Sequence, residues 1–229
     1  MVLSIVYFQS PLSKVSNIEV TGNHNVSSDE IIKLSGLSNR TSFWKIDKED
    51  VITTIKGHQE IHDIQLERML PNRVLITVNE WNRIAYVVDT DNQYYPLLEN
   101  GQTLPPLNNL TEQTDAPLLV GWHENGDIIS MVNELTKLPE GITNAISEIH
   151  YEPTNSDPHH LKLYMNNGYE VSVTIRGFAK KMEAYPSVIG ELDPSMKGII
   201  HLDVVPFFEQ YKDNDVENEE GDEMIESEG

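Results

Sequence analysis

Two alternating apolar stretches, residues 64–66 and 74–78, constrain the fold most because they fit together in one register. A three-residue loop between them pairs Leu66 with Ile76, which keeps the apolar residues on one face of the hairpin. A two-residue loop would place Glu67 opposite Ile76 and divide that face. The sequence therefore predicts an antiparallel hairpin with a three-residue loop and one buried face.

Two helix patterns precede this hairpin. Ser27 is placed to cap the first helix, with Glu30 three residues later in a capping box and Gly36 at its end. Asp47 and Gly57 mark the start and the end of the second helix. A short alternating strand comes before both helices, so the predicted order is β-α-α-β-β.

From about residue 83 the chain becomes richer in strands, proline and glycine. The clearest element is a hairpin around Asn166-Asn167-Gly168, in which glycine supplies the left-handed residue of the loop. Helices are predicted at 126–138 and 177–192, residues 142–151 fit either a helix or a strand, and 198–208 read as a final apolar strand. The predicted fold class is α+β: the β-α-α-β-β domain, then a larger mixed β-sheet domain with flanking helices.

The net charge of −21 argues against nucleic acid as a partner, because phosphate binding needs a basic face. It argues against an anionic membrane surface for the same reason. Residues 212–229 contain nine acidic residues and one lysine, and almost no apolar residues, so they are predicted to be a disordered acidic tail. The chain has no cysteine, which removes disulfides, thiolate metal sites and cysteine nucleophiles.

Catalytic patterns are sparse. His58 and His62 have the spacing of a helical metal pair, but Gly57 ends the helix before them. His159 and His160 lie in a polar loop and form at most a weak metal site. The sequence has no HExxH, G-x-S-x-G, G-x-G-x-x-G or phosphate-loop motif. No enzyme activity and no cofactor are predicted, which leaves a binding or structural protein.

The first eight residues contain no charge and one polar residue, Ser4. A signal peptide does not fit, because no basic residue precedes the run and no small-residue cleavage site follows it. The run is also shorter than the roughly 20 residues that cross a bilayer. Two interpretations remain from these residues: a buried first strand, or the outer end of a membrane anchor.

The final apolar strand is the best candidate for a partner-binding site. It is rich in β-branched and aromatic residues, and no further strand is predicted after it. As a sheet edge it would expose unpaired backbone groups and accept a strand from another chain. The alternative is an interior strand with both edges covered.

Several stretches together resemble the FtsQ/DivIB family. The β-α-α-β-β unit ending in "PNRVLITVNEWNRIAY" is similar to a POTRA domain of the FtsQ type, and "YYPLLENGQTLP", "PLLVGW", "LYMNNGYEVSVTIRGFAKKMEAYPSVIGEL" and "GIIHLDV" resemble the Gram-positive branch. The resemblance extends from about residue 7 to 211. It implies the outer end of a truncated transmembrane helix at 1–10, a POTRA domain at 13–82, a β domain at 83–211 and the tail at 212–229.

The resemblance also implies a function. Such proteins are non-catalytic, single-pass membrane proteins of the division septum, with their C-terminal domains extracellular. They hold FtsL and DivIC (FtsB in Gram-negative relatives) during septal peptidoglycan synthesis, with the septal penicillin-binding protein as a further partner.

In Gram-negative relatives the partner adds a strand to the last strand of the β domain. Carried over, the partner-binding residues are Ile199, Ile200, His201, Leu202, Asp203, Val204 and Val205, with Phe207, Phe208, Tyr211, Lys180 and Lys181 as further candidates. The chain departs from those relatives at Asp203 and Val204, where they tend to have a basic residue and an aromatic one. This departure argues against a salt bridge at that position to an acidic partner.

Two alternative functions compete with this one. A POTRA-type chaperone or secretion module would need tandem POTRA units or a C-terminal barrel. An exported metal-dependent hydrolase would rely on His159 and His160, and stoichiometric metal in the purified protein would support it.

Overall fold

The computed structural model describes residues 13–107, 116–122, 127–193 and 195–211. The expected anchor segment at 1–10 and the acidic tail at 212–229 lie outside these ranges. Contacts divide the chain into two compact units, with the boundary between Asn82 and Arg83. Among the described residues, no helix is both long and apolar enough to cross a membrane.

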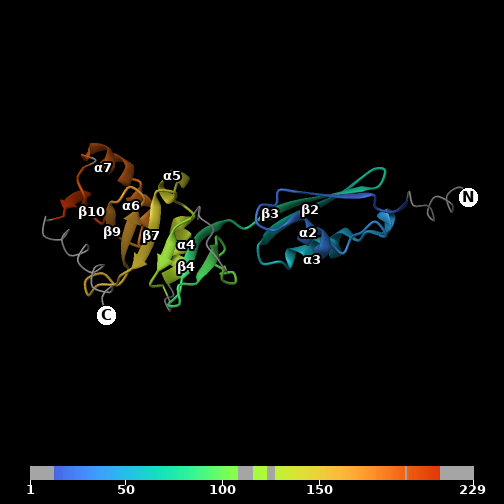
Figure 1. The fold of residues 1–229 in the computed structure, drawn as a ribbon, viewed down its shortest axis with the longest axis horizontal. Coiled ribbons are helices and arrows are strands. Elements are labelled where there is room, and N and C mark those ends of the chain that lie inside the picture. Colours follow the sequence, from blue (N-terminus) through green and yellow to red (C-terminus); the bar gives the residue numbers. More distant parts are fainter. Residues whose placement is uncertain (1–12, 108–115, 123–126, 194, 212–229) are drawn as a thin grey trace, which may run out of the picture. The chain divides into compact units, whose positions relative to one another are not determined.

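The first unit is a three-stranded sheet with two α-helices on one face (Figure 1). Its elements are β1 (Asn17–Thr21), α2 (Ser28–Ser35), the 3₁₀ helix η2 (Phe43–Lys45), α3 (Lys48–Lys56), β2 (Ile61–Met69) and β3 (Arg73–Glu80). The strand order is β1-β3-β2, with β1 parallel and β2 antiparallel to β3. The predicted order of elements is confirmed.

The capping signals in the sequence account for both helices of this unit. The Ser27 side chain accepts a hydrogen bond from the Glu30 N–H at 3.2 Å, and Gly36 ends α2 in the left-handed conformation with φ 64°. Asp47 accepts from the N–H groups of Glu49 and Asp50 at the start of α3. These bonds satisfy backbone donors that the first turn of a helix leaves unpaired.

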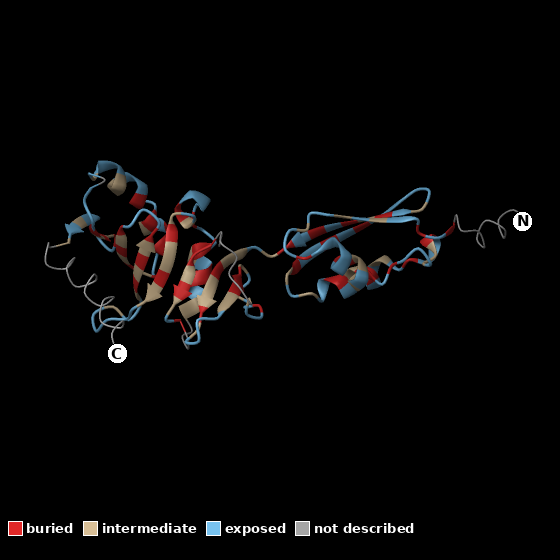
Figure 2. Cartoon of the chain, viewed as in Figure 1, coloured by how far each residue is buried: buried red, intermediate tan, exposed pale blue. Residues whose placement is uncertain are grey.

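The hairpin register is the one predicted. Leu66 pairs with Ile76, and Met69 pairs with Arg73, which leaves residues 70–72 as the loop. The buried residues of the hairpin, coloured red in Figure 2, belong to one core with residues of α2 and α3. The core of this unit consists of Val15, Val26, Ile31, Leu37, Phe43, Ile46, Val51, Ile55, Ile61, Ile64, Leu66, Val74, Ile76 and Val78.

The second unit is built on an eight-stranded mixed sheet in the order β11-β10-β9-β8-β7-β6-β4-β5. Its strands are β4 (Arg83–Val88), β5 (Tyr94–Leu98), β6 (Leu118–Val120), β7 (Ile146–Tyr151), β8 (His160–Met165), β9 (Glu170–Thr174), β10 (Gly198–His201) and β11 (Phe207–Gln210). Its helices are α4 (Asp127–Leu135), α5 (Glu140–Thr143), α6 (Phe178–Met182) and α7 (Tyr185–Glu191). The α+β fold class is therefore confirmed.

The β8–β9 hairpin forms around the predicted loop at residues 166–168. Leu161 pairs with Val173 and Leu163 with Val171, and Gly168 has φ 83° in the loop. Inward-facing residues of the sheet pack against α4, α6 and α7 in one continuous core. Residues 142–151, which fitted either structure, hold the end of α5 and all of β7.

Two predictions for the C-terminal part are wrong. The single helix at 177–192 is two helices, α6 and α7, because Pro186 lies in the first turn of α7 and cannot continue a helix from α6. The single strand at 198–208 is a hairpin, in which β11 folds back antiparallel to β10. Since β10 also pairs with β9, β10 is an interior strand, and β11 forms the edge of the sheet among the described residues.

Candidate partner-binding edge

The β10–β11 hairpin brings the predicted partner-binding residues to one end of the sheet. Ile199, Ile200 and His201 lie on β10, Leu202, Asp203, Val204 and Val205 in the following turn, Phe207 and Phe208 on β11, Tyr211 just after it, and Lys180 and Lys181 on α6. Ile200 and Leu202 are buried in the core, and the Leu202 N–H donates to the carbonyl of Ser172 on β9. These two residues therefore support the edge from inside.

A close backbone approach fixes β11 against β10. A Cβ atom added at Gly198 would clash with the carbonyl oxygen of Glu209 and would lie 2.9 Å from the Phe208 ring. No side chain fits in that space, so glycine is required here for packing.

Side chains also join the two strands. His201 Nε2 lies 3.0 Å from Glu209 Oε2, and the His201 ring stacks on the Phe207 ring with centroids 4.4 Å apart and 11° between the planes. On the other side of β11, the Phe208 ring meets Tyr169 edge to face at 6.0 Å. The short strand β11 is thus held by contacts on both of its faces.

The hydrogen-bond pattern shows which backbone groups of β11 point outward. The N–H of Tyr211 donates to the carbonyl of Lys197, so Tyr211 and the alternate residues Glu209 and Phe207 face β10. Phe208 and Gln210 consequently turn their N–H and C=O groups to the open edge. Among the described residues, no strand pairs with that edge.

Apolar side chains lie exposed next to the open edge. Val204 is 93% exposed, Val205 70% and Phe207 55%. All three are in the turn or on the edge strand itself, whereas most large apolar residues of this unit are buried. The edge therefore offers outward backbone groups and adjacent apolar surface in one place.

Asp203 is engaged within the chain. Its Oδ1 accepts a hydrogen bond from the Thr174 N–H at 2.9 Å and lies 3.3 Å from Lys181 Nζ. The turn between β10 and β11 is thereby tied both to the end of β9 and to α6. Lys180, the neighbouring candidate, is exposed on α6.

Sequence reasoning missed Gly198 and Glu209 as residues of this edge. A signal was present: "DVVP" places Pro206 inside the supposed strand, and proline removes a ladder donor there. Treating Pro206 as the end of a turn would have predicted a hairpin and brought Glu209 opposite β10.

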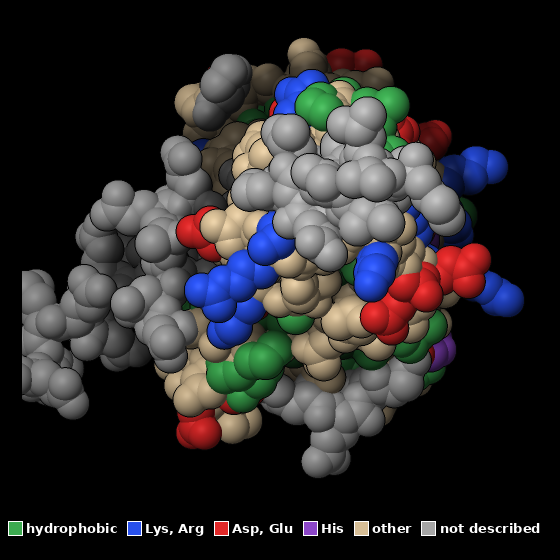
Figure 3. Space-filling view, turned by 90° about the vertical axis from the view of Figure 1, so that its right-hand side faces the viewer, with side chains coloured by type: hydrophobic (Ala, Val, Ile, Leu, Met, Phe, Trp, Pro, Cys, Tyr) green, Lys and Arg blue, Asp and Glu red, His purple; other side chains and the backbone are tan. Residues whose placement is uncertain are grey.

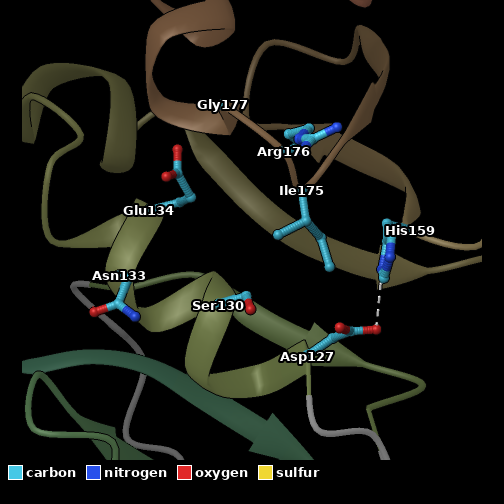
Figure 4. Close-up of a pocket in the computed structure, with 8 residues that line it drawn as sticks. All are labelled: Asp127, Ser130, Asn133, Glu134, His159, Ile175, Arg176 and Gly177. Atoms are coloured by element: carbon cyan, nitrogen blue, oxygen red, sulfur yellow. Dashed lines mark hydrogen bonds and ion pairs between the residues drawn. The ribbon is translucent and has the colours of Figure 1, made fainter.

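A cavity of about 570 Å³ lies on the second unit beside α4 (Figure 4). Asp127 Oδ2 accepts from the Tyr151 hydroxyl at 2.8 Å and lies 3.2 Å from His159 Nδ1. Burial alone would raise the pKa of Glu134, but hydrogen bonds from the Lys137 side chain and the Ala179 N–H lower it overall. Both carboxylates of this cavity are thus engaged in tying α4 to its neighbours.

The two loop histidines do not converge on one site. His159 contacts Asp127, whereas the ring nitrogens of His160 lie 3.0 Å from the carbonyl of Glu152 and 3.0 Å from the Ser172 hydroxyl. In the described ranges, no three His, Asp or Glu residues are grouped as a metal site would require. His62 lies on β2, and the centroid of its ring is 3.9 Å from the centroid of the Trp81 ring.

Known proteins of one family match most of this chain. The sequence model described as "POTRA domain, FtsQ-type" matches residues 13–81, and "Cell division protein FtsQ/DivIB, C-terminal" matches residues 85–205. Cell division protein DivIB of Geobacillus kaustophilus is 45% identical over 222 residues, which covers 97% of this chain and 84% of that protein. The Bacillus subtilis protein of the same name is 43% identical over 216 residues, covering 94% and 81%.

A solved structure is also similar: the major extracytoplasmic domain of the trans isomer of the cell division protein DivIB from Geobacillus stearothermophilus. It shares 45% identity, covers 52% of this chain and 99% of that chain, and has a TM-score of 0.43. The two sequence models together match nearly all of the described residues. The chain therefore belongs to the FtsQ/DivIB family of cell division proteins.

Proposed function

We propose that the chain is a non-catalytic, membrane-anchored divisome scaffold that binds and stabilises FtsL and DivIC, the counterpart of FtsB, at the division septum. Family membership supports the role in cell division. The choice of these partners, the membrane anchor with an extracellular C-terminal part, and the septal penicillin-binding protein as a further contact follow from the resemblance described above.

The observation that carries the binding mode is the open edge of β11. A partner strand next to β11 would pair with the outward N–H and C=O groups of Phe208 and Gln210. Main-chain hydrogen bonds would supply affinity, and the exposed side chains of Val204, Val205 and Phe207 would supply apolar contacts. The partner thus extends the eight-stranded sheet by one strand.

Removing a single backbone donor tests whether the partner binds by adding a strand to β11. The N–H of Gln210 points to the open edge, so Gln210→Pro removes it without removing a bond between β10 and β11. Gln210→Ala is the matched control, because it keeps the N–H and loses only the side chain. Leu202→Pro is unsuitable, since its N–H donates to Ser172 inside the sheet.

The measurement is the affinity of the full chain and both variants for a purified complex of the FtsL and DivIC ectodomains. We expect Gln210→Pro to bind about tenfold more weakly, and Gln210→Ala within about twofold of the parent. Circular dichroism and the thermal midpoint check that both variants fold. Equal affinity for folded Gln210→Pro and the parent would place the site away from this edge, and no binding by the folded parent would reject these partners.

A further inference from the structure

Three segments of the first unit meet at the end where the chain enters it. They are Lys14–Ser16, Arg40–Lys45 and Arg68–Arg73, and we call their shared surface the basic end. Lys14 forms an antiparallel bridge with Ser42, and the Val15 N–H donates to the carbonyl of Thr41. The Ser16 N–H and hydroxyl both donate to Asn72 in the β2–β3 loop.

The basic end has a charge opposite to that of the whole chain. Its three segments contain Lys14, Arg40, Lys45, Arg68 and Arg73, and no Asp or Glu, although the chain carries −21. All five cations are exposed. Within the described part of the chain, none of them lies in an ion pair.

Exposed apolar residues lie among these cations. Leu70 is 71% exposed at the tip of the β2–β3 loop, and Met69 beside it is 36% exposed. Trp44 is 45% exposed in η2, and its ring packs edge to face on the buried ring of Phe43 at 5.2 Å. The indole is therefore held at the surface by the core.

Figure 3 looks onto this end of the molecule. Lys and Arg side chains are spread over the face, where patches of apolar side chains and some Asp and Glu side chains of neighbouring segments are also visible. An indole and aliphatic groups next to basic side chains form the combination that binds at the interface of a bilayer. The rings and methyl groups enter the headgroup layer, while the cations meet lipid phosphates.

We infer that the basic end docks on the surface of a bilayer that contains anionic phospholipid. Charge complementarity favours this partner, and in the sequence the uncharged run Met1–Phe8 precedes Lys14 of the basic end by only five residues. The inference deepens the proposed membrane-anchored scaffold and rests on it in one respect: the anchor keeps this end next to the lipid. Docking would then hold the first unit at the headgroups.

The total negative charge does not prevent this contact. At physiological ionic strength, charges separated by more than about 8 Å are largely screened. The local cluster of five cations therefore decides the interaction at contact, and each basic residue near an anionic surface adds to the attraction. Net charge alone predicts that an anionic membrane surface is not a partner. The local charge of the basic end leads to the opposite expectation.

Vesicle binding of the full chain tests the inference. Cosedimentation is measured with vesicles of phosphatidylcholine alone and with vesicles that contain about one third phosphatidylglycerol. The test variant is Arg40→Glu/Lys45→Glu. The control variant Lys33→Glu/Arg176→Glu changes the total charge equally at exposed sites outside the basic end. Circular dichroism and the thermal midpoint confirm that both are folded.

We expect the parent to prefer the anionic vesicles, the test variant to lose at least tenfold in affinity for them, and the control to stay within about twofold. Insertion of the apolar run alone would give equal binding to both kinds of vesicle. Equal loss in the test and control variants, or no preference of the parent for anionic vesicles, overturns the inference.

A second readout follows Trp44 directly. Lipids brominated near the headgroup quench an indole that enters the interface. We expect the parent to be quenched more than Trp44→Phe, which keeps the other two tryptophans. Equal quenching of the two proteins contradicts docking by this face. Partner binding at β11 is measured without vesicles, so failure of either proposal is recognised separately.

Discussion

Lys181 Nζ lies 3.3 Å from Asp203 Oδ1, so a helix and the β10–β11 turn are joined at the edge where a partner is proposed to bind. Asp203 is one of the two positions, with Val204, at which the resemblance to Gram-negative relatives is expected to break down. Because the carboxylate also accepts the Thr174 N–H, its contacts are satisfied inside the chain. Asp203 therefore positions the turn, and we expect the proposed partner to contact its neighbours instead.

Asp203→Ala is expected to lower the free energy of unfolding by about 1 kcal/mol, since it removes one charge-assisted backbone bond and a partly exposed ion pair. Partner affinity should change by less than about threefold. Urea unfolding and the binding assay measure the two effects. Lys181→Ala serves as the control for the ion pair alone, and a larger loss of affinity than of stability would assign Asp203 to the partner contact.

Gly198→Ala is expected to detach β11 from β10, because the added Cβ would meet the Glu209 carbonyl and the Phe208 ring. Overpacking of this kind costs about 1–3 kcal/mol. Hydrogen exchange of the Phe207 and Glu209 amides measures the detachment, which should appear as faster exchange.

Gly190→Ala in α7 is the matched control for that substitution. A Cβ there meets nothing within 4 Å, so the change should be neutral or slightly stabilising. Unchanged exchange at β11 in Gly198→Ala would contradict the close approach of the two strands.

Glu80→Gln tests a carboxylate that joins the end of β3 to the loop before α2. Glu80 ends β3, and its oxygens accept from the N–H groups of His24, Asn25 and Val26 at 2.8–3.1 Å. Burial would raise the pKa of Glu80, but these bonds lower it below the ordinary value of 4.5. The substitution should cost about 1–3 kcal/mol at pH 7.

The pH dependence follows from the direction of this shift. A lowered folded-state pKa means that the stabilisation is present above pH 4.5 and is lost as the pH falls through the folded-state value. Urea unfolding at pH 7 and at pH 3 should therefore show a smaller difference in Glu80→Gln than in the parent. Glu67→Gln, at an exposed site on β2, is the control, and an equal difference in all three proteins would contradict the assignment.

Local signals made much of the fold predictable. Ser27 and Asp47 cap helices through bonds that depend on neighbours in sequence, and the pairing of Leu66 with Ile76 follows from keeping one face apolar. Pro186 and Pro206 are equally local signals, but the apolar pattern continues on both sides of each proline and predicts one unbroken element. The helix break and the β10–β11 hairpin were missed for that reason.

The rest depends on contacts between distant parts of the chain. Nothing near Glu80 in the sequence indicates that its carboxylate binds the loop before α2, some 55 residues earlier. The basic end likewise joins Lys14, Arg40 and Arg73 from three separate segments. The net charge of the chain does not indicate the basic end, because a sum over all residues does not show where the charges lie.

The parallel pairing of β1 with β3 has a mechanical consequence. Asn17 lies next to Arg73, and the two strands run side by side in the same direction until Thr21 meets Thr77. The chain enters the unit at the start of β1 and leaves after the end of β3. Tension between these two points would load the interstrand bonds in shear, all at once, instead of opening them one after another. A pulling force applied between these two points would therefore be shared by several interstrand bonds of the first unit.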